Sequence, residues 1–172
     1  ASYTARGDSI VCAMTATDGA TSSDTVSSDA VTIENSAPMI MSVALSPSSI
    51  ATSDTVNVLV TSADADGDSV SYAYNWTVDG VSIPAASSAT LDGSLWFDKG
   101  QTVVVTVTPN DGFEDGVSEA SAGVTVGNTA PGTPVVAIDP THPREGEDDL
   151  ICAIDVPAID VDGDSLDYVF SW

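Results

Sequence analysis

Two short acidic segments hold the residues of this chain that are best suited to chemistry. The first places Asp64, Asp66 and Asp68 in the sequence Asp-Ala-Asp-Gly-Asp, and the second places Asp160, Asp162 and Asp164 in Asp-Val-Asp-Gly-Asp. Alternating aspartates on a tight loop bring their carboxylates together, and the glycine permits the sharp turn. Calcium prefers such hard oxygen ligands. The spacing therefore predicts a Ca²⁺ site at each segment.

Neighbouring loops and linkers are expected to complete these sites. The first site would add Asn35 and Asp111, and the second would add Asn128 and Asp98. Carboxylates crowded near one point repel one another unless a cation lies between them. An EF-hand is rejected, because the twelfth position counted from Asp64 is Asn75 and the flanking residues have strand character. A solvated acidic loop, or a generally acidic surface, is the alternative that needs no metal.

The charge of the chain limits its partners. Its 172 residues include 26 Asp and Glu but three Lys and Arg, for a formal net charge of −23. Nucleic acid and anionic membrane surfaces require basic patches, so neither is expected as a partner. No apolar run approaches the roughly 20 residues that span a bilayer. Valine-rich runs that alternate with Ser and Thr favour strands over disorder.

Internal repetition sets the expected domain organisation. Residues 7–38 align without gaps to residues 100–131, so that Asp18-Gly19 falls on Asp111-Gly112 and both segments end in Asn-x-Ala-Pro. The two acidic segments form a second, colinear match, 96 residues apart because of a short insertion between His142 and Ile159. The two matches predict tandem repeats with a period of about 93 residues. The expected boundaries are the C-terminal part of one repeat (1–35), a complete repeat (36–128) and the N-terminal part of a third (129–172). Proline should make the linkers between them short and stiff.

Strand signals in the complete repeat recur at the spacing of a β-sandwich. The expected strands are residues 40–45, 55–61, 69–78, 101–108 and 122–126, with another inside 89–96. Val56, Val58 and Val60 should share one face, and Trp76 and Trp172 should be core anchors. No useful window has helical periodicity. The fold class is therefore all-β, with tandem immunoglobulin-like β-sandwiches.

The combined pattern resembles a known group of proteins. Asp-x-Asp-Gly-Asp-Ser-[Val/Leu]-x-Tyr-x-[Tyr/Phe]-x-Trp, with Asn-x-Ala-Pro linkers and a later Asp-Gly, is similar to the bacterial immunoglobulin-like, PKD-like and cadherin-like repeats of large secreted or cell-surface proteins. The resemblance covers essentially the whole chain. It implies β-sandwiches in series, often with calcium at loops or junctions. The Asp-x-Asn-Asp-Asn linker of cadherins is absent.

The two cysteines are placed by the repeat. Cys12 is equivalent to Val105 on the predicted strand 101–108, and Cys152 lies near the equivalent of Val58 on strand 55–61. The corresponding strands carry the inter-sheet disulfide of many immunoglobulin domains. We therefore expect each cysteine to pair with a partner outside this sequence or in a neighbouring copy. Two unpaired buried thiols are the alternative.

Other motifs receive less weight. Arg6-Gly7-Asp8 spells an integrin-binding tripeptide, but its equivalent Lys99-Gly100-Gln101 reads as an ordinary turn. Asn75-Trp76-Thr77 fits a glycosylation sequon, but the sequence does not decide whether it carries a glycan, and glycans are kept only as a candidate addition. No catalytic motif surrounds His142, the single histidine, and an enzyme is not expected.

The expected function is a structural repeat of an extracellular fibre, stalk or giant surface adhesin, stiffened by calcium at its junctions. Its partners would be neighbouring repeats of the same protein, including head-to-tail copies in a fibre. The alternative is an accessory module of a secreted enzyme, with carbohydrate as its ligand. Both place the chain outside the cell or on its surface.

Overall fold

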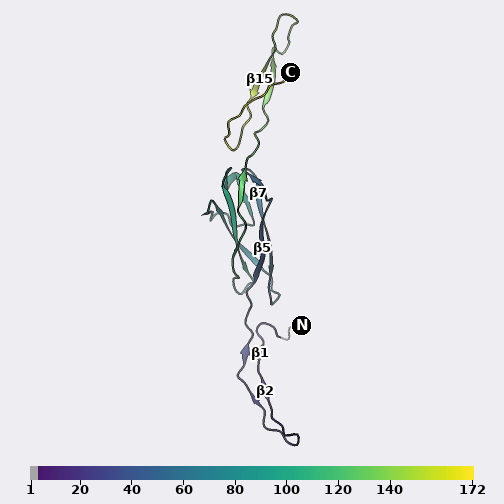
Figure 1. Ribbon diagram of the computed structural model, residues 1–172, viewed down its shortest axis with the longest axis vertical. Helices are drawn as coiled ribbons and strands as arrows, with labels where there is room; N and C mark the ends of the chain where they lie inside the picture. Colours follow the sequence, from purple (N-terminus) through teal and green to yellow (C-terminus); the bar gives the residue numbers. More distant parts are fainter. Residues whose placement is uncertain (1–3) are drawn as a thin grey trace. The chain divides into compact units, whose positions relative to one another are not determined.

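The computed structural model describes residues 4–172 (Figure 1), and nearly all of its regular structure is β-strand. By contacts the chain forms two units, and each is described by itself. The first comprises residues 4–42, Val60–Ala73 and Val107–Glu119, and the second comprises Val43–Leu59, Tyr74–Thr106 and Ala120–Trp172. No helix within the described residues is long and apolar enough to cross a membrane.

Two sheets form the middle of the chain, where β5 and β7 are labelled in Figure 1. The three-stranded sheet has the order β10-β7-β5, made of β5 (Met39–Ser46), β7 (Thr55–Ala63) and β10 (Thr90–Asp92). The larger sheet has the order β6-β13-β11-β8-β9, with β12 paired to β11. Its strands are β6 (Ile50–Ala51), β8 (Ser71–Val78), β9 (Val81–Ser82), β11 (Thr102–Asn110), β12 (Glu119–Ala120) and β13 (Val124–Gly127).

Apolar side chains from both sheets are removed from solvent. Val103, Val105 and Val107 alternate along β11 and have no exposed surface, and Val56 on β7 is equally buried. Trp76 on β8 is also fully buried and donates its Nε1–H to the Ser88 carbonyl at 2.9 Å. Along β7, the buried Val56 and the half-buried Val58 and Val60 alternate with exposed residues, so their expected common face is confirmed. The expected burial of Trp76 is also confirmed, and the all-β class is correct.

One short helix interrupts a segment expected to contain a strand. Strand β10 ends at Asp92, and α1 (Gly93–Trp96) follows within the predicted 89–96 range. Asp92 caps the helix, because its Oδ1 accepts the Ser94 N–H at 3.0 Å. Gly93 is needed here, since a Cβ atom would lie 2.5 Å from the Phe97 ring and from the Thr52 carbonyl. A helix of four residues is too short to produce a periodic sequence signal.

The first unit contains a narrow hairpin of short strands. Strand β1 (Ser9–Ile10) pairs with β4 (Val31–Thr32), and β2 (Ala13–Met14) pairs with β3 (Val26–Ser27), all antiparallel. Its apolar side chains, including Met14 and Val26, remain exposed.

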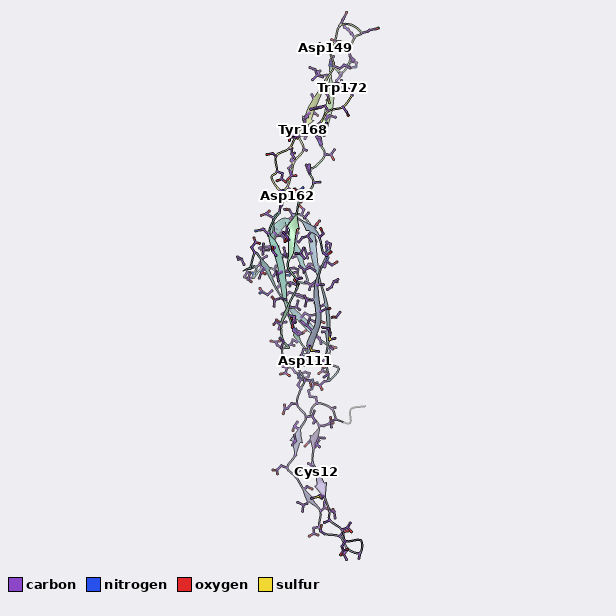
Figure 2. The ribbon with its side chains drawn as sticks, viewed as in Figure 1. Cys12, Asp111, Asp149, Asp162, Tyr168 and Trp172 are labelled. Carbon is purple, nitrogen blue, oxygen red and sulfur yellow. The ribbon has the colours of Figure 1, made fainter. Side chains whose placement is uncertain are left out.

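The second unit contains another antiparallel pair, β14 (Val135–Asp139) with β15 (Ile151–Val156). Residues 165–172 form no strand, and the Trp172 side chain is 79% exposed (Figure 2). Trp172 is therefore not part of a core within residues 4–172, and its role as a core anchor of a third repeat stays a prediction.

Candidate metal centres

The first acidic loop (residues 64–68) folds around the side chain of its first aspartate. Asp64 Oδ1 accepts the backbone N–H groups of Asp66 and Asp68 at 2.9 and 3.0 Å. Gly67 has φ of 82°, a conformation that glycine adopts without steric cost. This turn brings one carboxylate oxygen from each of Asp64, Asp66 and Asp68 to within 4.8 Å of the others.

The second acidic loop (residues 160–164) repeats that construction. Asp160 Oδ1 accepts the N–H groups of Asp162 and Asp164 at 2.9 and 3.2 Å, and Gly163 has φ of 76°. Oxygens of Asp160, Asp162 and Asp164 again lie within 4.8 Å of one another. Within residues 4–172, these are the two groups of at least three acidic, His or Cys side chains that are close enough to share a metal ion. Both were predicted from the sequence.

The middle aspartate of each loop holds a linker. Asp66 Oδ2 accepts the backbone N–H of Ser36 at 2.8 Å, in the first linker (residues 35–38). Asp162 Oδ2 accepts the N–H of Thr129 at 2.5 Å, in the second linker (residues 128–131). Each linker is therefore fixed to an acidic loop by the same backbone bond.

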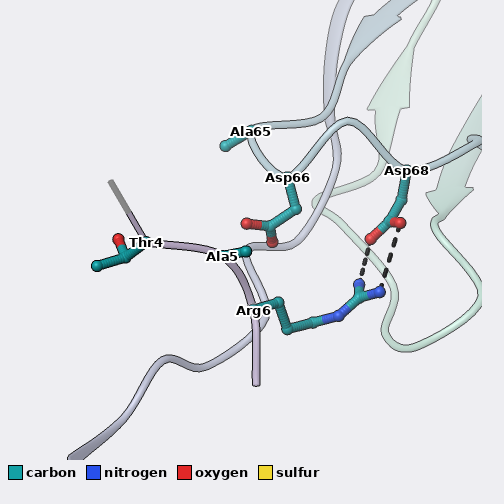
Figure 3. Close-up of a pocket in the computed structure, with 6 residues that line it drawn as sticks. All are labelled: Thr4, Ala5, Arg6, Ala65, Asp66 and Asp68. Atoms are coloured by element: carbon teal, nitrogen blue, oxygen red, sulfur yellow. Dashed lines mark hydrogen bonds and ion pairs between the residues drawn. The ribbon is translucent and has the colours of Figure 1, made fainter. Parts of the chain in front are cut away.

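A basic side chain lies on the third aspartate of each loop. Figure 3 shows the guanidinium of Arg6 turned toward the carboxylate of Asp68, with which it forms an ion pair. Lys99 Nζ lies 2.5 Å from Asp164 Oδ2 in the second unit. The hydrogen bond to Asp164 raises the pKa of Lys99 above its usual value, so Lys99 remains charged at neutral pH.

The charge balance leaves room for a divalent cation. Three carboxylates and one basic group at each loop leave two negative charges uncompensated. Asp64 Oδ2 is buried and receives no hydrogen bond, although such atoms normally have a partner. An open pocket of about 290 Å³, lined in part by Asp66 and Asp68, adjoins the first loop. The oxygen donors, the charge and this unpaired atom fit a hard divalent cation.

Asp111 lies beside the first loop in a supporting position. Its Oδ1 accepts the N–H groups of Phe113 and Glu114 at 2.7 and 2.8 Å, and its Oδ2 accepts Asn35 Nδ2–H at 2.7 Å. The bond from Asn35, with those from the backbone, lowers the pKa of Asp111 to about 2. Asp111 is outside the group of three close aspartates. In this structure it connects the first linker to the loop after β11.

Asp162 is held more firmly than its counterpart Asp66. The buried Thr52 hydroxyl donates to Asp162 Oδ1, in addition to the Thr129 N–H on Oδ2. The bond from Thr52, followed by that from Thr129, lowers the pKa of Asp162. Thr52 had no sequence signal of its own, because it lies far from the loop along the chain.

The remaining expected ligands lie at the edge of the second site. Asn128 Oδ1 accepts from Lys99 Nζ at 2.8 Å, close to Asp164. Asp98 is exposed and outside the group of three aspartates, and its backbone N–H donates to Gln101 Oε1 at 2.7 Å. Asp98 therefore begins the turn that carries Lys99.

Arg6 and Lys99 are site residues that were not selected from the sequence. Arg6 belongs to the Arg-Gly-Asp tripeptide, and its guanidinium binds Asp68 and Asn35. In the same tripeptide, Asp8 Oδ2 accepts the Ala5 N–H at 2.8 Å. The tripeptide is thus a hydrogen-bonded turn with its arginine engaged. The sequence did contain a signal for their shared role, because Arg6 and Lys99, two of the three basic residues, are one repeat length of 93 positions apart.

Both cysteines are free within the described residues (Cys12 is labelled in Figure 2). Cys12 is exposed between β1 and β2, and Cys152 lies on β15 opposite Ile138. Their expected partners lie outside this sequence, so the disulfides stay predictions.

Comparison with protein-family models and with curated proteins finds no match for this chain. The structure shows an all-β protein with two acidic loops of one design, each bonded to a linker and to a basic side chain.

Proposed function

We propose that this chain is part of a tandem array of immunoglobulin-like β-sandwiches that bind calcium at their linkers. The array would be a structural element of an extracellular fibre, stalk or surface adhesin. The observation that carries the proposal is the recurrence of one constellation: three close carboxylates, a linker N–H on the middle one and a basic group on the third.

The strand order supports the immunoglobulin-like assignment. The smaller sheet, of order β10-β7-β5, corresponds to strands E-B-A of such a sandwich. The larger sheet, of order β6-β13-β11-β8-β9, corresponds to strands A′-G-F-C-C′. Val58 on β7 and Val105 on β11, near the equivalents of the two cysteines, belong to different sheets. That placement favours an inter-sheet disulfide in the repeats that contain cysteine.

Equivalent residues also make equivalent bonds, which supports the 93-residue repeat. Asp18 Oδ1 accepts the N–H groups of Ala20 and Thr21 at 2.9 and 2.7 Å, just as Asp111 Oδ1 accepts those of Phe113 and Glu114. These bonds, led by that from Thr21, lower the pKa of Asp18. The two Asp-Gly segments therefore form the same loop.

Calcium would be held mainly by the first two aspartates of each loop, because the third is shared with a basic group. It would supply two positive charges at a point where two negative charges are uncompensated. A metal bound there would tie the acidic loop to the linker that follows the preceding repeat. The duplication of the site in each unit favours a structural role over catalysis.

Calcium titration followed by calorimetry and by NMR tests the proposal. We expect two sites with dissociation constants of about 10⁻⁴–10⁻³ M, the range of extracellular calcium modules. At ten times the dissociation constant, binding should stabilise the folded state by about 1.4 kcal/mol. Scattering profiles recorded with calcium and with a chelator should differ.

Matched variants assign each site. Asp66→Asn should weaken binding at the first loop, and Asp162→Asn should weaken it at the second, because each removes one ligand charge. Asp29→Asn and Asp149→Asn are the controls, since both aspartates are exposed and outside the loops. Absence of calcium binding at millimolar concentration, or equal loss in the controls, would reject the calcium assignment.

A further inference from the structure

Positive charge in this acidic chain is concentrated at one position of the repeat. Of its three basic residues, Arg6 and Lys99 occupy the second position of the same turn, whereas Arg144 lies in an exposed pair with Glu147. In the first basic turn (residues 5–8) the Asp8 N–H donates to the Ala5 carbonyl at 3.0 Å. In the second basic turn (residues 98–101) the Gln101 N–H donates to the Asp98 carbonyl at 3.2 Å.

Glycine gives both turns the same shape. Gly7 and Gly100 have φ of 84° and 86° at the third position, as a type II turn requires. Each glycine N–H also donates to a backbone carbonyl two residues before the linker, at Ile33 O (2.8 Å) and Val126 O (2.9 Å). The basic side chain therefore starts from a fixed backbone next to the linker.

Each basic group then bridges the same two partners. Arg6 Nη1 donates to Asn35 Oδ1 at 2.7 Å and to Asp68. Lys99 Nζ donates to Asn128 Oδ1 at 2.8 Å and to Asp164 Oδ2 at 2.5 Å. The asparagines begin the two linkers, and the aspartates end the two acidic loops. A basic residue, an asparagine and an aspartate therefore form the same three-residue contact at both loops.

We propose that Arg6 and Lys99 are internal latches that hold each linker against its acidic loop without metal, and that a divalent cation must compete with them for the third aspartate. The latch follows from the hydrogen bonds of Arg6 and Lys99 alone, and its competition with calcium rests on the proposed function. The ligand class is a hard divalent cation, and the basic residue sets how strongly each loop binds it.

The two latches differ in strength. Arg6 places both terminal nitrogens on Asp68, and its guanidinium carbon lies 3.6 Å from the centre of the Phe113 ring. A planar guanidinium gains from bidentate binding and from stacking on an aromatic ring, whereas an ammonium acts as a point charge. Lys99 is also more exposed than Arg6, at 40% against 28% for the side chains. Calcium should therefore displace Lys99 more readily than Arg6.

The test uses calcium alone as the probe and measures each loop separately. Lys99→Met keeps the length of the stem but removes the charge. Its calcium affinity at the second loop should rise roughly tenfold, as expected when one adjacent positive charge is removed from a partly exposed site. Lys99→Arg should lower that affinity, and Arg144→Met should leave both loops unchanged.

A metal-free readout separates the latch from the calcium site. In the presence of a chelator, amide exchange at Thr129 should be faster in Lys99→Met than in the parent, while exchange at Ser36 stays the same. Arg6→Met should have the reverse effect. Both amides are hydrogen-bonded to the middle aspartates, so they report on linker attachment.

The outcomes distinguish the two proposals. If no variant binds calcium but exchange at Thr129 responds to Lys99→Met, the calcium assignment fails and the latch stands. If calcium binds equally to the parent and Lys99→Met and exchange does not change, the latch is rejected and calcium binding stands.

Discussion

The two acidic loops have the same backbone but different surroundings. In both, the first aspartate accepts two N–H groups, the middle one holds a linker and the third meets a basic group. The first loop has a stacked arginine, and the second has a lysine plus a buried threonine on Asp162. Five residues therefore determine the loop, while residues from distant strands and turns determine its charge balance.

The largest expected effect comes from removing the first aspartate of either loop. Asp64→Ala eliminates both the hydrogen bonds that shape the first loop and the unpaired buried oxygen. Calcium affinity at that loop should fall by more than the roughly 10–100-fold that loss of an outer partner costs. Asp160→Ala should do the same at the second loop, as measured by NMR titration of each.

Asp64→Ala and Asp160→Ala together test whether the two loops bind calcium in the same way. Asp24→Ala is the control, because Asp24 is exposed and outside both groups of aspartates. If one loop lost calcium binding without its first aspartate and the other did not, the two loops would share their sequence but not their mode of binding.

A smaller effect is expected from acid on the first linker. The folded-state pKa of Asp111, about 2, is below the ordinary aspartate value of 3.8. The stabilisation from Asp111 is therefore complete above the unfolded value and is lost as pH falls through about 2. Asn35→Ala removes the largest cause of the shift, so the pKa of Asp111 should rise toward 3.8.

Carboxyl NMR titration without calcium measures this change. Asp18, which has a similar loop but accepts no linker amide within the described residues, is the internal control. Its pKa should be the same in the parent and in Asn35→Ala. A parallel rise at both aspartates would indicate general loosening of the fold.

The smallest expected effect separates the loops through Thr52. Thr52→Val keeps the shape of this buried side chain but removes the hydroxyl bonded to Asp162. The pKa of Asp162 should rise, and calcium affinity at the second loop should change by less than about tenfold. Amide exchange at Ser36 in the first linker should stay unchanged. A change at Ser36 would contradict the conclusion that Thr52 acts on the second loop alone.

The sequence predicted the parts of the fold that depend on local patterns. Residues 40–45 and 55–61 lie within β5 and β7, and all but the first residue of 101–108 lie within β11, because alternation of apolar and polar side chains marks half-buried strands. The acidic loops were also predicted, since their first aspartate shapes them through bonds within five residues. Both features are determined by neighbours in the chain.

The parts that were missed depend on distant neighbours. The Arg6–Asp68 and Lys99–Asp164 pairs join residues 62 and 65 positions apart, so neither segment reveals its partner. Helix α1 depends on close contact of Gly93 with Phe97 and Thr52. The contacts of Asp111 also come from a distance, since Asn35 donates to one of its oxygens and the N–H groups of Phe113 and Glu114 donate to the other, and its role as a metal ligand stays a prediction.

Strands β6 and β13 pair in parallel, with Val126 opposite Ile50 and Gly127 opposite Ala51. The C-terminal end of β13 leads directly into the second linker. The N-terminal end of β6 is connected through β5 to the first linker. Tension applied through the two flanking linkers would therefore pull these strands past each other and load their hydrogen bonds together rather than one at a time. A chain connected in this way would resist extension through shear of β6 against β13.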